Sequence, residues 1–534
     1  MKDCPHIGKI NGKKVLIVND TPFIILGGEV HNSNSSSAEY MESIWNKAEN
    51  LGMNTLLVPV TWEMTEPEEG VFDFQLVDSL IAQALERGKK LILLWFGSWK
   101  NAQCYYAPSW VKTNLGRFRR AEIEKGKNLI KLSEFYDIDY TSLSYLCNET
   151  KKADANAFSK LLAHIRDIDE EHQTVIMVQV ENETGIMGSA REHSDLADQI
   201  FAQTVPEKFV NYMRSHTDSM EKDVRSEVMR GTEKGSWKEV FGEAAEEIFS
   251  AYHIASYVNY VAEAGKREYP LPMSVNCWLD KGEKPGLYPS GGPVAKMMEV
   301  WQYAAPSIDI IGPDIYVPDF CGTCESYQKN GNPLFIPETA THAYAGPRQV
   351  YVAGHYHGLC FAPFGFEEMG EAFTNVQARL FGVDTGDPVL AIPQNPEEYG
   401  WYNRELSEMM PLLTERYGTT DLQAVIYEKR EETVMDFENW KIMADMESSL
   451  LKRKDGVCLA LRISENEFYI MANGCEIKFL SGDPERPNVD YLLLEEGKFK
   501  NGKWHAQRRI NGDEAVSLLY ESPVLLHVKL FAYQ

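Results

Sequence analysis

The sequence predicts an α/β fold, a (β/α)8 TIM barrel with helical insertions, followed by a C-terminal β-sandwich domain. Three features of the 534 residues support this prediction. Eight short apolar runs occur before residue 365, stretches with helical spacing separate most of them, and the pattern becomes strand-rich near residue 418. Strand followed by helix, repeated eight times, is typical of a barrel whose active-site residues lie at the carboxyl ends of its strands.

The N-terminal segment INGKKVLIVNDTPFIILGG indicates a hairpin that leads into the first barrel strand. Each of the eight apolar runs has the length of a buried strand in a parallel sheet. They are Phe23–Leu26, Thr55–Val60, Lys90–Phe96, Val175–Val180, Met273–Asn276, Ile308–Pro313, Pro333–Ile336 and Leu359–Phe364.

Two of the stretches between these runs show helical periodicity. The stretch that ends at Gly52 has apolar side chains at Tyr40, Ile44, Trp45 and Ala48. The stretch that ends at Gly88 has them at Leu76, Leu80, Ile81 and Ala84. Residues 100–155 and 186–270 are too long for a single helix between strands, so we expect helical insertions at the carboxyl ends of the strands.

The barrel with its short hairpin is predicted to occupy residues 1–419, and the β-sandwich residues 420–534. Beyond residue 418, strand-like runs alternate with Gly, Asn and Asp turns, and helical patterns are sparse. These runs are LQAVIYEK, VCLALRIS, EFYIMANG, DYLLLEEG, KWHAQRRING and VLLHVKLFAY. This domain could brace the barrel, bind sugar or mediate assembly, which leaves a homo-oligomer open.

The charge balance narrows the choice of partners. With 53 Lys and Arg against 79 Asp and Glu, the formal net charge is −26. Nucleic acids and anionic membranes are themselves polyanions, so neither is expected as a partner. The N-terminus MKDCPHIGKINGKK has no apolar signal core, and no apolar run reaches the ~18 residues of a membrane span, which predicts a cytoplasmic protein.

Neither a metal nor another cofactor is predicted. The nine cysteines are scattered, as free thiols in a reducing compartment are, and Cys321 and Cys324 form a C-x-x-C that lacks a second pair. His355 and His357 have the H-x-H spacing of metal-dependent barrel hydrolases. They precede the eighth strand instead of lying in the first, so a metal site is not expected there.

The residues at the carboxyl ends of the predicted strands are rich in carboxylates, indoles and amides. In strand order they are Glu29 and His31; Trp62 and Glu63; Trp99, Lys100 and Asn101; Glu181, Asn182 and Glu183; Asn276 and Trp278; Asp314 and Tyr316; Glu338; and Phe364. Indoles stack on the apolar faces of sugars, and amides and carboxylates bind sugar hydroxyls. Cleavage of a glycosidic bond requires two carboxyl groups, one protonated and one ionised. A carbohydrate substrate is therefore expected.

Several motifs, in matching order, resemble the retaining β-galactosidases of glycoside hydrolase family 35. They are ILGGEVHNSN, the stretch from YMESIWNKAENLG to WEMTEPEEGVFDF, IMVQVENETG and PLFIPETA. The segment YPSGGPVAKMMEVWQYAAPSIDIIGPDIY, with the strand-rich tail, is similar to a bacterial branch that has a C-terminal β-domain. The resemblance implies an enzyme of the barrel glycosidases of clan A, with catalytic glutamates after strands four and seven.

The resemblance also implies the roles of individual residues. The acid/base is the glutamate after asparagine, Glu183, and the nucleophile is Glu338. Asn182 would bind the 2-hydroxyl of the sugar, and Tyr316 would donate to the nucleophile. The remaining candidates for substrate binding are Glu29, His31, Trp62, Glu63, Trp99, Asn101 and Trp278.

Strand periodicity alone does not choose between Glu181 and Glu183, because residues two apart share a face of a strand. The resemblance selects Glu183 and leaves a structural role for Glu181. The loops after strands two and three, WEMTEP and FGSWKNA, depart from the family patterns W-N-x-H-E-P and Y-I-C-A-E-W. Release of terminal β-D-galactose is the expected activity. Open alternatives are a β-glucoside, β-fucoside or α-arabinoside as substrate, and a carbohydrate-binding protein without turnover.

Overall fold

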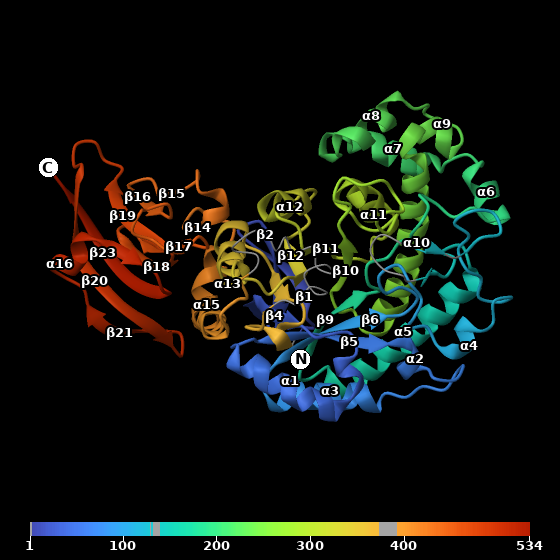
Figure 1. Cartoon of the computed structure of the whole chain (residues 1–534), viewed down its shortest axis with the longest axis horizontal. Helices are drawn as coiled ribbons and strands as arrows, with labels where there is room; N and C mark the ends of the chain where they lie inside the picture. Colours follow the sequence, from blue (N-terminus) through green and yellow to red (C-terminus); the bar gives the residue numbers. More distant parts are fainter. Residues whose placement is uncertain (1–2, 129, 132–138, 373–391) are drawn as a thin grey trace.

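A computed structural model describes residues 3–128, 130–131, 139–372 and 392–534, and it contains a closed eight-stranded parallel barrel (Figure 1). Around the barrel the strands follow the order β10-β11-β12-β13-β4-β5-β6-β9. All eight predicted strands are present, with ends that differ by up to three residues. Their bounds are β4 Ile25–Glu29, β5 Thr55–Thr61, β6 Lys90–Phe96, β9 Val175–Val180, β10 Met273–Trp278, β11 Ile310–Ile315, β12 Phe335–Thr339 and β13 Cys360–Pro363.

The N-terminal segment forms a three-stranded antiparallel sheet where a hairpin was predicted. Its strands are β1 His6–Ile10, β2 Lys13–Val18 and β3 Thr21–Phe23. Phe23 ends β3 and Ile25 begins the barrel, so the first predicted strand contained parts of two strands. Leu16 and Val18 belong to the same apolar cluster as barrel residues such as Leu57 and Ile92. The small sheet therefore helps to bury the apolar interior of the barrel.

Helices α1 (Ala38–Asn50) and α3 (Gln75–Glu86) confirm the predicted helical stretches. Helix α1 begins after Ser37, whose side chain accepts a hydrogen bond from the backbone N–H of Tyr40. Tyr40, the first of the apolar residues at helical spacing, is 58% exposed, and Met41 is buried in its place. Met41, together with Ile44 and Ala48, follows the i, i+3, i+7 spacing of one helical face.

Of the two predicted insertions, the second is helical and the first is mostly loop. Before β10 lie α6 Asp195–Phe201, α7 Glu207–Ser215, α8 Lys222–Arg230, α9 Trp237–Phe241 and α10 Ala245–Glu268. Between β6 and α5 (Asn148–Asp169), the described residues contain the short helix α4 (Ser109–Lys112) and the two-residue strands β7 (Ile130–Lys131) and β8 (Asp139–Tyr140). Within the described part of the chain, none of the helices is long and apolar enough to span a bilayer.

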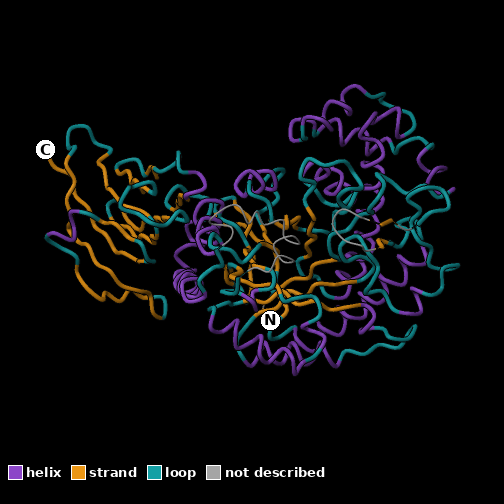
Figure 2. The backbone as a smooth tube through the Cα atoms, viewed as in Figure 1, coloured by secondary structure: helices purple, strands orange, loops and turns teal. Residues whose placement is uncertain are grey.

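The C-terminal part consists of two antiparallel sheets (Figure 2). The six-stranded sheet has the order β14-β17-β18-β23-β20-β21, with bounds Leu422–Ile426, Val457–Ser464, Glu467–Asn473, Val524–Tyr533, Asn488–Lys500 and Lys503–Arg509. The four-stranded sheet has the order β15-β16-β19-β22, with bounds Val434–Asp436, Trp440–Asp445, Cys475–Ser481 and Leu518–Tyr520. Together they form the predicted β-sandwich.

The six-stranded sheet contributes to two hydrophobic cores. Leu459 and Met471 join the core of the barrel and its helices, whereas Cys458 and Ile470 join the core between the two sheets. Residues adjacent in a strand point to opposite faces. The sheet is therefore buried on both faces in its centre, and one of these faces packs on helices α13 (Ala345–Tyr351) and α15 (Pro396–Arg416).

A buried ion pair joins the barrel to the sandwich. Arg348 of α13 is 1% exposed and binds Glu428, directly after β14, through two bonds of 2.6 and 2.8 Å. The guanidinium also lies 4.4 Å from the centroid of the Phe320 ring. A bidentate pair of this kind satisfies both charges where water is excluded.

We predict that Arg348→Ala lowers the free energy of unfolding by about 3–5 kcal/mol, because it leaves Glu428 as an unpaired carboxylate at the junction. The exposed pair Arg117–Glu69, with an N–O distance of 2.8 Å, is the matched control. Arg117→Ala should cost no more than about 1 kcal/mol. Urea unfolding measures both variants, and equal losses would contradict the prediction.

Candidate active site

Glu183 and Glu338 meet at the face formed by the carboxyl ends of the barrel strands. Glu183 follows β9 and Glu338 lies near the end of β12, and both are less than 10% exposed. Asp314 of β11 completes the group: one carboxyl oxygen from each of the three residues lies within 4.8 Å of the others. The fold thus assembles three carboxyl groups that are far apart in the sequence.

Glu338 accepts three hydrogen bonds from side chains. Oε1 accepts from Asn182 Nδ2 at 3.3 Å and from Asn276 Nδ2 at 3.1 Å, and Oε2 accepts from the Tyr316 hydroxyl at 3.1 Å. Donors on both oxygens favour the ionised carboxylate. The arrangement suits a carboxylate that must remain negative in order to attack or stabilise an electrophilic carbon.

The Asn276 side chain connects the three carboxyl-bearing segments. Its Oδ1 accepts the backbone N–H of Glu183 at 3.0 Å, and its Nδ2 donates to Asp314 Oδ2 at 2.8 Å as well as to Glu338. Since Nδ2 has two hydrogens, both are used. Asn276 of β10 therefore fixes the positions of residues from β9, β11 and β12 relative to one another.

The backbone around Asn182 explains how two nearby glutamates take different positions. β9 ends at Val180, and Glu181 (φ 63°) and Glu183 (φ 44°) both adopt left-handed backbone conformations, which are uncommon outside glycine. Strand alternation therefore no longer applies at these residues, contrary to the expectation that they share a face. Such strain is typical of functional sites.

Glu181 supports the loop after β6. Its Oε2 accepts the backbone N–H of Trp99 at 2.8 Å. Burial, followed by the charge of Asp154, raises the pKa of Glu181 well above its ordinary value. A Cβ on Gly97 would lie 2.9 Å from Glu181 Oε1 and 2.4 Å from the Trp95 indole nitrogen, so only glycine fits between them.

The pKa of Glu183 is raised to about 7, chiefly by burial and then by the negative charge of Glu338. Lys100 opposes this rise. Burial also raises the pKa of Glu29 and of Asp314 well above their ordinary values, and the Glu338 charge adds to both shifts. Glu183 is therefore about half protonated at pH 7 and mostly protonated at lower pH.

Lys100 is the cation of this site. Its Nζ donates to Asn182 Oδ1 at 2.9 Å and lies 5.1 Å from the centroid of the Phe96 ring. Burial lowers its pKa, but the carboxylates around it, Glu338 first, outweigh burial and raise the pKa overall. Lys100, Asn276 and Asp314 stood at predicted strand ends, but sequence reasoning gave them no role. For Asp314 the available signal was its position near the end of β11, two residues before Tyr316.

The structure brings some of the predicted substrate-binding residues to the carboxyl pair. Asn182 and Tyr316 bind Glu338 directly, and Glu29, at the end of β4, is buried close enough for the charges of Glu338 and Lys100 to act on it. Trp99 is 1% exposed and packs edge-on against Tyr257 at 4.8 Å. Its indole N–H has no hydrogen-bond partner among the described residues.

Other predicted residues lie farther out or in the core. Trp62 is fully buried and donates its indole N–H to Glu66 at 2.9 Å, so it is packed as a core residue. Glu63 pairs with Lys112 at 3.2 Å in a half-exposed position. His31 packs edge-on against Phe364 at 4.9 Å and lies 3.7 Å from Glu368.

Asn101 and Trp278 flank the site without a contact to either carboxyl group. Asn101 follows Lys100 with a left-handed backbone (φ 52°), and its Oδ1 is buried without a hydrogen-bond partner in the described part of the chain. Trp278 ends β10 in register with Asp314, and its side chain is half-buried. Both positions would allow contact with a substrate, but the contacts described for these two side chains do not test that prediction.

The cluster of Glu183, Asp314 and Glu338 does not have the surroundings of a metal site, although its carboxyl oxygens are close enough to one another to share an ion. Mg²⁺ and Ca²⁺ require shells of oxygen ligands. Here Asn276 directs N–H groups at Asp314 and Glu338, and the ammonium of Lys100 already supplies positive charge. We therefore assign none of the three as a metal ligand.

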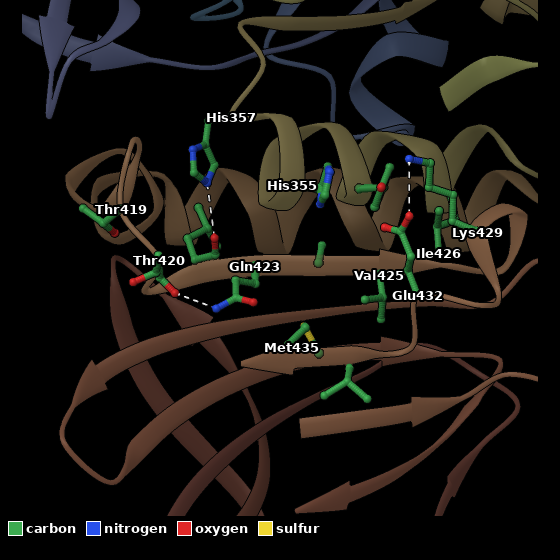
Figure 3. A pocket seen from close by; sticks show the side chains of 14 residues that line it. His355, His357, Thr419, Thr420, Gln423, Val425, Ile426, Lys429, Glu432 and Met435 are labelled. Atoms are coloured by element: carbon green, nitrogen blue, oxygen red, sulfur yellow. Dashed lines mark hydrogen bonds and ion pairs between the residues drawn. The ribbon is translucent and has the colours of Figure 1, made fainter. Parts of the chain in front are cut away.

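A pocket of about 290 Å³ lies where the π-helical segment Val352–Tyr356 meets β14, and His355 and His357 line it (Figure 3). His357 Nδ1 accepts the backbone N–H of Gly418 at 3.0 Å, and Nε2 contacts the carbonyl oxygen of Leu422 at 3.2 Å. Burial lowers the pKa of His357 to about 4. Both ring nitrogens are thus engaged in a neutral imidazole. Residues before β13 also lie at the opposite end of the barrel from Glu338.

We predict that Glu181→Gln folds as stably as the unaltered protein, because an amide can accept the Trp99 N–H and the carboxyl group it replaces is itself protonated. Glu181→Ala should lose about 1–3 kcal/mol, because it leaves the Trp99 N–H without a buried partner. Thermal and urea unfolding of the two variants test this. A Gln variant as unstable as the Ala variant would show that Glu181 is needed as an anion.

Two family models match the chain. Residues 15–122 match "Glycosyl hydrolases family 35", and residues 404–519 match "Domain of unknown function (DUF5597)". The first range includes Glu29 and Lys100 but ends before Glu183. A search of curated proteins found no match.

Solved structures similar to the chain include two bacterial β-galactosidases. That from Rahnella sp. R3 is 14% identical over 73% of this chain, with a TM-score of 0.43, and the chain spans only 56% of its length. That from Bacillus circulans sp. alkalophilus is 10% identical over 95% of this chain and 99% of its own length, with a TM-score of 0.46. The matching family model covers the part of the barrel where the first sequence motifs lie, so residues 15–122 are similar to glycosyl hydrolases family 35.

Proposed function

We propose that the protein is a retaining exo-glycoside hydrolase that releases terminal β-D-galactose from β-galactosides by double displacement. The observation that carries the proposal is the pairing of Glu183 and Glu338 at one barrel face, with carboxyl oxygens within 4.8 Å. Retaining enzymes place their two carboxyl groups about 5–5.5 Å apart, whereas inverting enzymes need roughly 6.5–9.5 Å to admit water.

The two carboxyl groups differ in the way that this reaction requires. Glu338, with hydrogen bonds from Asn182, Asn276 and Tyr316, would attack the anomeric carbon as a carboxylate. Glu183, whose pKa is raised to about 7, would give its proton to the leaving oxygen. In the second step Glu183 would take a proton from water as that water displaces Glu338 from the sugar.

The residues around this pair suit a sugar with several hydroxyls. Asn182 is placed beside Glu338, where the hydroxyl next to the anomeric carbon would lie, and Glu29 and Lys100 offer further polar contacts. Galactose is the preferred sugar because the sequence motifs resemble β-galactosidases of family 35 and residues 15–122 match the model of that family. A β-glucoside, β-fucoside or α-arabinoside is the alternative, because the loops after β5 and β6 depart from the family pattern.

A panel of p-nitrophenyl glycosides with NMR analysis of the product anomer tests sugar and mechanism together. We expect the highest kcat/KM with β-D-galactoside and release of the β-anomer first. Release of the α-anomer would contradict the retaining mechanism, whereas a preference for another sugar would change only the substrate. A protein that binds galactose but hydrolyses none of the glycosides would be a carbohydrate-binding protein.

We predict that Glu338→Gln lowers kcat by on the order of 10⁴-fold or more, the scale seen when a hydrolase loses its nucleophile. A 2-deoxy-2-fluoro-galactoside with a good leaving group should label Glu338, as found by mass spectrometry of the digested protein. Glu181→Gln is the matched control, since it alters a neighbouring buried carboxyl group and should remain labelled at Glu338. Label on any other carboxyl group would contradict the assignment.

The pH dependence of kcat/KM should report the ionisation of Glu183. Because its pKa is raised to about 7, the proton required for the first step is present below this pH and is lost above it. The value of kcat/KM for a substrate with a poor leaving group should therefore fall above about pH 7. Glu183→Gln should abolish this fall and lower kcat/KM by about 10²–10⁴-fold, with least effect on a dinitrophenyl glycoside. A fall that persists in this variant would assign the proton to another group.

The location and the assembly of the protein remain predictions. We infer a cytoplasmic enzyme of acidic surface whose partner is a carbohydrate, with neither nucleic acid nor membrane bound. A homo-oligomer through the C-terminal sandwich is compatible with its exposed edge strand β21. Analytical ultracentrifugation would decide between monomer and oligomer.

A further inference from the structure

Asp314 is a third carboxyl group at the site, and the two-carboxylate reaction gives it no task. It is 2% exposed, lies within 4.8 Å of both Glu183 and Glu338 through single oxygens, and accepts a hydrogen bond from Asn276. A buried carboxylate beside two others would be repelled by both. The position of Asp314 is therefore easier to explain if its carboxyl group is protonated.

We propose that Asp314 is a positioning residue for the catalytic acid: its carboxyl group stays protonated throughout the reaction and donates a hydrogen bond to the carboxyl group of Glu183. This inference rests on the proposed glycosidase function and deepens it. No proton leaves Asp314 in either step. The proton that reaches the leaving oxygen comes from Glu183, and the proton that returns to Glu183 comes from water.

The charge count of the site supports a protonated Asp314. In the described part of the site, four buried carboxyl groups, Glu29, Glu183, Asp314 and Glu338, surround one ammonium, that of Lys100. If all were ionised, the net charge would be −4 + 1 = −3 among side chains that are at most 6% exposed. With only Glu338 ionised, the charge of Lys100 is balanced. Burying unpaired charge is costly, so the neutral arrangement is favoured.

The burial of Asp314 and the charges around it also favour its protonated form. Burial raises its pKa well above the ordinary value, and the nearby charges of Glu338 and Glu183 raise it further. Hydrogen bonding by Asp314 in turn lowers the pKa of Glu183. The titratable groups that face it from the surrounding elements are Glu183, Glu338, Glu29, Cys277, Lys100, Tyr316 and Tyr327.

The hydrogen bond would give the acid a direction. A protonated carboxyl group can carry its hydrogen on either oxygen. If Asp314 donates to one oxygen of Glu183, that oxygen acts as the acceptor, and the proton of Glu183 is kept on the other. Since Asn276 holds both the backbone N–H of Glu183 and Oδ2 of Asp314, the two carboxyl groups keep a fixed relation. After proton transfer, the same bond stabilises the Glu183 carboxylate.

The variant Asp314→Asn tests the proposal, because an amide has the shape of a protonated carboxyl group and still donates a hydrogen bond. We expect the apparent pKa of the alkaline limb of kcat/KM to stay within a few tenths of a pH unit of its value in the unaltered enzyme. If Asp314 were instead ionised, its replacement would remove a negative neighbour, and the limb would move down by about 1 unit or more. A displacement of that size in either direction would overturn the proposal.

A second variant and a second readout separate this role from a purely structural one. Asp314→Ala loses the hydrogen-bond donor, so the alkaline limb of kcat/KM should move to higher pH and kcat should fall. Circular dichroism reports whether the variant is folded. Asp218→Asn, which alters an exposed carboxyl group paired with Arg225 at 3.7 Å, is the matched control and should change neither limb nor kcat.

Infrared difference spectra give a measurement that does not depend on activity. At pH 7, without substrate, the C=O band of a protonated carboxylic acid should be lost from Asp314→Asn and retained in Asp218→Asn. A spectrum unchanged by Asp314→Asn would refute the proposal. If the unaltered protein hydrolysed none of the glycosides, the glycosidase function would fail, and the infrared result would still decide the protonation state of Asp314.

Discussion

The side chain of Asn276 is the interaction on which the geometry of the site depends. Its amide binds the backbone of Glu183, which follows β9, and the carboxyl groups of Asp314 in β11 and Glu338 in β12. A barrel aligns the ends of its strands only approximately, because loops of different length follow each one. One planar amide with an acceptor and two donors supplies the remaining precision, and it does so at a residue that itself lies in a strand.

The same site shows how burial converts a group of acids into distinct chemical roles. Glu338 receives donors on both oxygens, which favours a carboxylate, whereas burial and the nearby charge of Glu338 raise the pKa of Glu183 to about 7. Lys100 limits how many carboxylates the site can carry, because it is the single ammonium buried among the described residues there. The difference between the two glutamates is thus a property of their environment.

Much of the fold was predictable from the sequence, because buried strands and amphipathic helices leave periodic patterns. The predicted ends of the fourth and seventh strands, Val180 and Ile336, lie within three residues of the observed ends, Val180 and Thr339. This accuracy was enough to place Glu183 and Glu338 at the same end of the barrel. Side-chain direction was not predictable: Trp62 is at a strand end yet points into the core, and the left-handed backbone at Glu181 and Glu183 follows no strand pattern. Contacts such as Asn276 with Asp314 depend on which strands are neighbours in the closed barrel, which local periodicity does not encode.

The strand order of the six-stranded sheet bears on how the chain is made. Strand β23, the last in the sequence, lies in the middle of the sheet between β18 and β20. During synthesis from the N-terminus, this position stays empty until residues 524–533 have left the ribosome. Strands β18 and β20, which both pair with β23, cannot be joined in one sheet earlier. Completion of this sheet therefore comes only after the whole barrel has been synthesised.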